Sequence, residues 1–296
     1  MDTRLQRFSP LKTILTFDDF DRGLCGWSEL IGNYSGHIGN VPPIRADMRP
    51  PQLSNGTFFD VGTHGAMDGT YTMKIATRPR RGHFGVALKR LTSRKDALYQ
   101  FEMWFSFKSE ARIGANAYDF TGYDGNFHPS EREFGAFTIG TDIVSLNDEV
   151  RSMSRLRYVN ADDDGNIVRR WYYNDSVDPT TKVHLEGRAT NPTDYQVMSP
   201  DDWKPIPGGE IAVCYNELPT KMNWHYLRWR WDTRTRRGVE LQLGDVVLDL
   251  RDIPVPTHAD HYDSLRSLMN VSLNVRANTS TRNFLFVDSA VVSTDA

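Results

Sequence analysis

The sequence predicts an all-β protein, a two-sheet antiparallel sandwich of the jelly-roll type. Apolar and polar residues alternate with a period of two along many segments, and turns rich in glycine and proline separate these segments. No long segment has the periodicity of an amphipathic helix. Many short strands with such turns indicate a sandwich or barrel. Roughly ten or more strands with long intervening loops favour a jelly roll, which holds about eight or more.

The two ends of the chain organise this prediction. Residues 15–27 read as a strand followed by an acidic turn and a glycine-rich bend, and residues 283–293 read as the last strand. Both segments carry phenylalanines typical of strands. If the first and last strands pair antiparallel, they close one sandwich and could bring together four carboxylates, those of Asp18, Asp19, Asp21 and Asp288.

The strands between these ends follow from local patterns. Residues 70–77 and 83–91 read as a hairpin, and residues 97–108 form the clearest strand, with five large apolar side chains on one face. The turn A-D-D-D-G-N predicts another hairpin between two strands. The remaining strands are expected at residues 134–142, 153–159, 167–173, 223–232, 239–250, 270–277 and 284–292.

We expect one domain, residues 1–296, because no linker separates two cores and the sequence has no internal repeat. Residues 1–14 read as a lead-in arm. Three segments rich in glycine, proline or polar residues read as long loops, and loops of this length are often functional. They are residues 31–66, 109–133 and 174–210.

Composition narrows the classes of function. The formal net charge of −3 gives no electrostatic drive toward nucleic acid or an anionic membrane. No apolar run approaches the roughly 18 residues that span a bilayer. The N-terminus lacks the apolar core of a signal peptide, so we expect a cytoplasmic protein. The sequence leaves open whether the chain forms a homo-oligomer.

Several motifs resemble the concanavalin A-like lectin/glucanase superfamily. They are the F-D-D-F-D turn with Gly26-Trp27, the W-x-x-x-R-W-x-W-D strand from Trp224, the strand at 239–250, and Phe286-Val287-Asp288. As a pattern, the resemblance covers most of the chain. It implies a jelly-roll sandwich that binds carbohydrate, or a glycoside hydrolase or polysaccharide lyase on the same scaffold. The E-x-D-x-x-E motif of the superfamily's glucanases and the Gln-Ile-His and Tyr-x-Lys motifs of its alginate lyases are absent.

The resemblance also implies a structural calcium ion where the acidic turn meets an aspartate of the last strand. Carboxylate and carbonyl oxygens suit Ca²⁺. The expected ligands are Asp18, Asp19, Asp21 and Asp288. In the alternative interpretation these residues are solvated turn acids, or Asp288 caps a turn.

The polar faces of the strands are the candidate binding residues. If these strands lie in one sheet, the face forms a concave groove that mixes aromatic rings, amides and guanidinium groups. Aromatic faces stack on sugar rings, and arginine binds carboxylate or phosphate in bidentate fashion, which favours an acidic saccharide. The alternative is a solvated face with cross-strand ion pairs. The candidates are Gln100, Trp104, Arg155, Arg157, Arg170, Tyr172, Trp224, Tyr226, Arg228, Arg230, Asn274 and Arg276.

Three classes of function remain open at this point. The leading hypothesis is recognition of an oligosaccharide or polysaccharide in the groove. The second is a glycoside hydrolase or polysaccharide lyase, since a glycosidase needs two carboxyl groups about 5–10 Å apart. The third is a non-catalytic structural or interaction protein. The candidate catalytic residues are Glu102, Glu131, Glu133 and His128.

Overall fold

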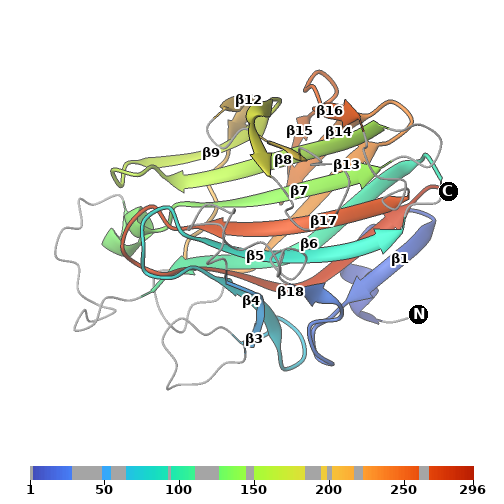
Figure 1. Cartoon of the computed structure of the whole chain (residues 1–296). Coiled ribbons are helices and arrows are strands. Elements are labelled where there is room, and N and C mark those ends of the chain that lie inside the picture. Colours follow the sequence, from blue (N-terminus) through green and yellow to red (C-terminus); the bar gives the residue numbers. More distant parts are fainter. Residues whose placement is uncertain are drawn as a thin grey trace, which may run out of the picture.

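The computed structural model describes residues 3–28, 49–54, 65–92, 95–110, 127–144, 150–183, 195–198, 202–216, 223–259 and 267–296. These residues form two β-sheets that pack as layers (Figure 1). The helical elements among them are two short 3₁₀ turns, η1 (Thr3–Arg7) and η4 (Pro129–Glu133). No helix in this part of the chain has the length and apolar character needed to cross a membrane.

Sheet A has eight strands, in the order β15-β14-β13-β6-β18-β4-β3, with β1 also paired to β18. Its bounds are β1 (Thr13–Asp18), β3 (Gln52–Ser54), β4 (Thr72–Ala76), β6 (Leu98–Ser109), β13 (His225–Asp232), β14 (Arg237–Leu243), β15 (Val246–Asp249) and β18 (Asn283–Thr294).

Sheet B also has eight strands, in the order β12-β9-β8-β7-β17-β5-β2, with β16 also paired to β8. Its bounds are β2 (Trp27–Ser28), β5 (Phe84–Thr92), β7 (Ala136–Val144), β8 (Val150–Ala161), β9 (Ile167–Asn174), β12 (Trp203–Glu210), β16 (Thr257–Ala259) and β17 (Leu268–Arg276). A separate pair joins β10 (Val177–Val183) and β11 (Tyr195–Met198). The pairings between named strands in both sheets are antiparallel, so the predicted two-sheet antiparallel sandwich is confirmed.

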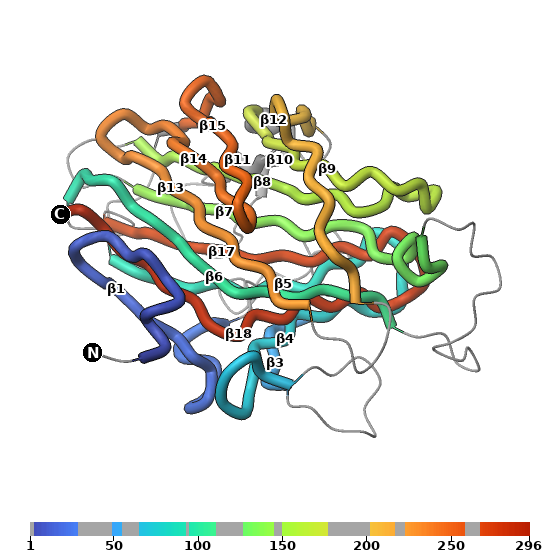
Figure 2. Tube along the Cα trace, turned by 180° about the vertical axis from the view of Figure 1, so that it is seen from behind, coloured from blue at the N-terminus to red at the C-terminus, as the bar shows by residue number. Residues whose placement is uncertain are grey.

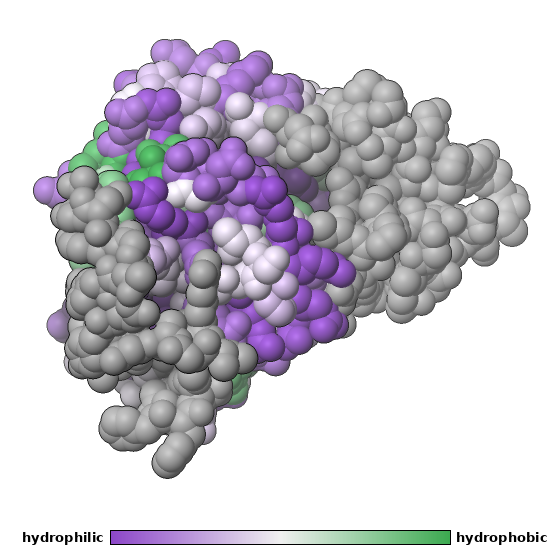
Figure 3. All heavy atoms as spheres, turned by 90° about the vertical axis from the view of Figure 1, so that its left-hand side faces the viewer, coloured by the Kyte–Doolittle hydropathy of each residue, from purple (hydrophilic) through white to green (hydrophobic). Residues whose placement is uncertain are grey.

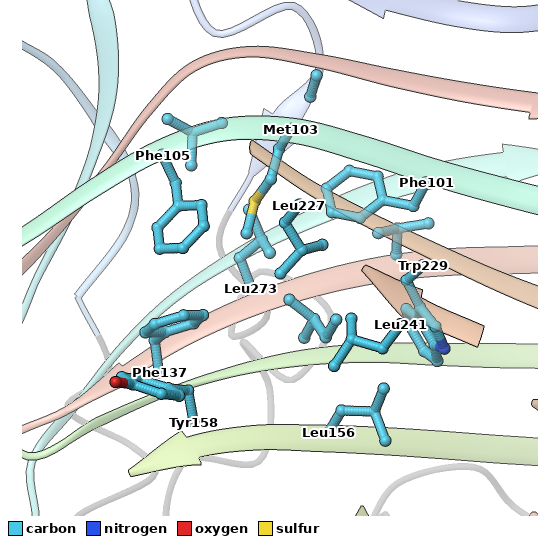
Figure 4. Packing of buried hydrophobic residues seen from close by; sticks show 14 of the residues in the cluster. Phe101, Met103, Phe105, Phe137, Leu156, Tyr158, Leu227, Trp229, Leu241 and Leu273 are labelled. Atoms are coloured by element: carbon cyan, nitrogen blue, oxygen red, sulfur yellow. The ribbon is translucent and has the colours of Figure 1, made fainter. Parts of the chain in front are cut away.

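The period-two pattern explains where the core lies. Alternate residues of each long strand point inward, and the inner faces of the two sheets share one hydrophobic cluster. In Figure 4, Phe101, Phe105 and Trp229 of sheet A point toward Phe137 and Leu273 of sheet B. All five side chains are fully buried. The other alternate residues of the same strands therefore form the outer faces of the sandwich.

The first and last strands lie side by side, as predicted (Figure 2). β1 pairs with the C-terminal half of β18, and Phe17 lies opposite Val291. The N-terminal half of β18, which contains Phe286, pairs with β4 instead. Asp288 lies between these two pairings, at an irregularity in the ladder between β18 and β6.

Two segments show the largest differences from prediction. The segment expected as one strand at residues 239–250 is a hairpin, because Gly244 adopts a φ of 59° and turns the chain between β14 and β15. The segment 174–210, expected as a loop, contains β10, β11 and β12. β12 is an edge strand of sheet B, a position where prolines are tolerated because one side of the strand needs no hydrogen-bond donor.

Candidate functional site

The predicted groove residues lie on opposite sides of the sandwich. β6 and β13 belong to sheet A, whereas β8, β9 and β17 belong to sheet B, and each strand turns its polar face outward. The expectation of a single groove is therefore wrong. We call the first group face A: Gln100, Glu102, Trp104, Trp224, Tyr226, Arg228 and Arg230. The second group is part of face B: Arg155, Arg157, Arg170, Tyr172, Asn274 and Arg276.

Strand register arranges face B in transverse rows. The first row crosses six strands and spans roughly 24 Å at the usual strand spacing. It consists of Val86, Asn274, Thr138, Arg157, Tyr172 and Pro205. The adjacent row consists of Leu88, Ser272, Gly140, Arg155, Asn174 and Trp203. Together these rows carry two arginines and no acidic residue.

Arg157 is held at the middle of face B. Its guanidinium lies 3.7 Å from the centroid of the Trp203 ring, and its Nε donates to Thr138 Oγ1 at 3.3 Å. A stacked guanidinium loses less freedom when it binds a carboxylate. Trp203 is not among the predicted site residues, because the prolines around it are typical of a loop.

The next row of face B differs in composition, because its arginines lie beside acidic residues. Arg170 contacts Glu210, and Arg276 donates to both oxygens of Asp163 at 2.6 and 2.9 Å. The hydrogen bond from Arg276 is the main reason why the pKa of Asp163 lies below its ordinary value. These two arginines therefore lie at the border of the two rows that contain no acidic residue.

Face A is a dense polar network around Glu102, which is fully buried. Its Oε1 accepts from the Tyr226 hydroxyl at 2.5 Å and from the backbone N–H of Ser9 at 2.7 Å. Gln100 accepts from Arg230 Nε at 2.5 Å and donates to the carbonyl of Ser9 at 2.8 Å. Burial first, and then the bond to Glu102, raise the pKa of Tyr226.

The arginines of face A face an acid of the neighbouring strand. Arg228 donates to Glu240 at 2.7 Å, and Arg230 lies 3.3 Å from the same carboxylate. Trp224 lies farther along the face, packed against a separate small cluster formed by Ala76, Phe284 and Phe286. Face A therefore neutralises its own charges within the sheet.

The remaining predicted catalytic residues lie in η4, at the end of the sandwich that Figure 3 shows to be largely hydrophilic. Glu131 is buried and accepts from Arg169 at 2.5 and 3.1 Å. Glu133 is buried and accepts from the Thr281 hydroxyl at 3.3 Å. His128 is the N-cap of η4 and accepts from the backbone N–H of Ser130. All three make contacts that stabilise the turn.

Glu102 is far from η4. Ser109, at the end of β6, donates to the carbonyl of Ser130 at 2.7 Å, which fixes η4 beside that end. Glu102 lies seven residues earlier on the same strand, or roughly 23 Å away at the rise of an extended chain. A glycosidase needs its two carboxyl groups about 5–10 Å apart. Glu102 therefore does not form such a pair with Glu131.

The four predicted calcium ligands are engaged by protein groups. Asp18 contacts Lys89 Nζ at 3.0 Å, and Asp19 contacts Arg4. Asp21 accepts from the N–H of Thr70 at 2.7 Å, and Asp288 accepts from the N–H of Met67 at 2.8 Å. Among the residues that the structure describes, no group of three or more acidic, histidine or cysteine side chains could hold a metal. Each of the four carboxylates is therefore paired or hydrogen-bonded within the protein, and the calcium site stays a prediction.

The whole chain, residues 1–296, matches a protein-family model described as a domain of unknown function (DUF6772). The chain belongs to this family. A search of curated proteins finds no match to the sequence.

Solved structures show distant similarity to the chain. A legume lectin-like domain from Entamoeba histolytica is 9% identical, with 82% of this chain and 88% of that chain covered and a TM-score of 0.37. Peanut lectin is 10% identical, with 82% and 90% covered and a TM-score of 0.37. A structure described with endo-acting O-glycanases of the human gut microbiota is 12% identical, with 95% and 98% covered and a TM-score of 0.34.

Proposed function

We propose that this protein binds an acidic oligosaccharide, or a segment of an acidic polysaccharide, along face B. The observation that carries this proposal is the pair of in-register rows that contain Arg155 and Arg157 but no carboxylate. Two adjacent rows with two guanidinium groups and no acid of their own favour an anionic ligand. Val86 and Leu88 at the β5 end of the rows are buried, so the accessible stretch runs from Asn274 to Pro205, and its roughly 19 Å suits an extended oligosaccharide more than a single small molecule.

The side chains around the two arginines have the chemistry that a saccharide needs. Tyr172 and Trp203 offer aromatic rings, while Ser272 and Asn274 offer hydroxyl and amide groups. Aromatic rings contact the C–H surface of a sugar, and hydroxyl and amide groups exchange hydrogen bonds with its hydroxyls. Arg157, stacked on Trp203, is oriented in advance for a bidentate bond to a carboxylate or sulfate.

Binding without turnover is favoured over glycoside hydrolysis. Of the predicted acids, Glu102 lies on face A, while Glu131 and Glu133 contact Arg169 and Thr281 in and around η4. None of the three belongs to the two rows of face B. A ligand along these rows would therefore not meet the predicted catalytic carboxylates.

A panel of acidic and neutral oligosaccharides tests the proposal. Calorimetric titration should give saturable binding of an acidic member, and an assay for new reducing ends should stay negative. Arg157→Ala should weaken binding at least tenfold, in line with the roughly 1.5–3 kcal/mol of a hydrogen bond to a charged group. Arg251→Ala is the matched control, since Arg251 is exposed and pairs with Asp249 outside face B.

Three results would overturn the proposal. Equal affinities of the wild type and Arg157→Ala for the same glycan would remove face B as the site. No binding of any acidic glycan would instead support the interaction-protein alternative. Release of product from a bound glycan would restore the enzyme alternative.

A further inference from the structure

The N-terminal arm, residues 3–11, lies across face A and is held by its side chains. Both backbone polar groups of Ser9 are held: its N–H donates to Glu102 at 2.7 Å, and its carbonyl accepts from Gln100 at 2.8 Å. The N–H of Leu11 donates to Ser293 Oγ at 3.0 Å. Glu102, Gln100 and Ser293 are all fully buried. The side chains of face A therefore already bind an extended polar segment, which is the protein's own.

The arm forms hydrogen bonds with only some of the buried polar atoms of this face. Three buried polar atoms beside it have no hydrogen-bond partner among the described residues: Glu102 Oε2, Trp104 Nε1 and Arg228 Nε. They are close in the sheet, because Glu102 lies opposite Arg228 and Trp104 lies opposite Tyr226. Buried polar atoms are nearly always bonded, so three unsatisfied atoms in one patch call for an explanation.

The three atoms define the chemistry of a better ligand. Glu102 Oε2 needs a donor, whereas Trp104 Nε1 and Arg228 Nε need acceptors. A hydroxyl group is both donor and acceptor, and a sugar carries several of them. The Trp104 and Tyr226 rings, with centroids 5.5 Å apart, add an aromatic surface. Arg228 and Arg230 balance the Glu102 and Glu240 carboxylates on and beside this face, so it has no net charge and the matching sugar is neutral.

We infer that face A is a second saccharide site, for a neutral sugar, and that the N-terminal arm closes it by occupying part of the site. This site is separate from face B and does not depend on it. The ligand would take the place of the backbone N–H and carbonyl groups of Ser9. It would also form hydrogen bonds to the three atoms that the arm leaves unsatisfied.

The anchors of the arm suit a removable cover. Arg4 contacts Asp19 and lies 3.5 Å from Asp21, and Arg7 contacts Asp68. Both arginine side chains keep 31% of their surface exposed, so salt screens these ion pairs. Phe8 adds one buried contact, an edge-on approach to Phe17 with ring centroids 6.2 Å apart. Loss of the ion pairs should therefore release the arm without unfolding the sheet beneath it.

The full-length variant Arg4→Ala/Arg7→Ala tests this inference. Hydrogen exchange should show faster exchange of the Ser9 and Leu11 amides than in the wild type. Calorimetric titration with the neutral probes maltotriose, cellotriose and lactose should show at least tenfold tighter binding of one of them. Glu102→Gln in the same background should abolish that gain, whereas Arg157→Ala, on face B, should leave it unchanged.

The wild type at increasing salt provides the same test without substitutions, should the variant fold poorly. Exchange of the Ser9 amide and affinity for the neutral probe should rise together. A released arm with no gain in affinity for any of the three probes would overturn the inference. So would an arm that stays protected both in the variant and at high salt, or a gain that Glu102→Gln does not remove.

Discussion

Faces A and B have the same kind of sequence but different chemistry. Both are the outward alternate residues of long strands, and both combine arginines with aromatic rings. On face A, Arg228 and Arg230 meet Glu240, and the arm covers Glu102. On face B, two whole rows around Arg157 contain no acid. The neighbours that strand register places across the sheet therefore give the two faces different charge environments, although their sequences are alike.

The largest expected effect concerns the structural role of face A. Glu102→Ala should lower the free energy of unfolding by about 3 kcal/mol, because it leaves buried groups of Ser9 and Tyr226 without their acceptor. Tyr172→Ala, at a half-buried position of face B, should lower it by less than about 1 kcal/mol. Urea unfolding monitored by tryptophan fluorescence measures both. Equal losses would erase the contrast between the two faces.

We expect the free energy of unfolding to depend on pH through Asp288, which lies at the edge of the side that the arm covers. Burial is the main reason why the pKa of Asp288 rises from 3.8 to about 6. Because the folded state holds this proton more tightly than the unfolded state, the stabilising contribution of protonated Asp288 is complete below pH 4 and is lost as the pH rises through 6. Asp288→Asn keeps an acceptor for Met67 and does not ionise.

At pH 8, the free energy of unfolding of Asp288→Asn should therefore exceed that of the wild type by a value on the order of 2 kcal/mol. The difference should shrink as the pH falls and should vanish near pH 4. Thermal unfolding of both proteins across this pH range provides the measurement. A difference that does not change with pH would mean that Asp288 titrates at its ordinary value.

A comparison at one residue sharpens the account of face B. Arg157→Lys keeps the charge but loses the planar fork that stacks on Trp203. Its affinity for the acidic glycan should fall between those of the wild type and Arg157→Ala, with a loss of roughly 1 kcal/mol. Calorimetric titrations of the three proteins are the test. Wild-type affinity in Arg157→Lys would show that only the charge of the guanidinium matters.

The smallest expected effect is that of calcium removal on the melting temperature. Lys89 and Arg4 already supply positive charge to Asp18 and Asp19. Treatment with a calcium chelator should therefore leave the melting temperature unchanged within about 1 °C, because these pairs already balance the two carboxylates without an ion. A clear drop, reversed by added calcium, would show that the predicted ion binds after all.

Much of the fold could be predicted from local patterns, because a period of two identifies strands and separates their inner and outer residues. The pairing of β1 with β18 also followed from their strand character. The division into two sheets could not be predicted in this way. β6 pairs with β13, more than 100 residues later, whereas β8 pairs with its sequence neighbours β7 and β9. Such long-range register leaves no local signal.

The site was predicted in part for the same reason. Arg157, Tyr172 and Asn274 were recognised as outward polar residues, and register brings them into one row. Trp203 was missed because Pro205 and Pro207 suggested a loop, although an edge strand accepts proline. The cover over Glu102 was missed because it depends on backbone groups of Ser9, which any residue but proline could supply.

Hydrogen-exchange mapping with the tightest-binding acidic oligosaccharide tests the assignment of the two faces most directly. We predict that the ligand slows amide exchange along β7, β8, β9 and β17 and leaves β6 and β13 unchanged. Protection confined to β6 and β13, or no protection in sheet B at saturating ligand, would contradict the account.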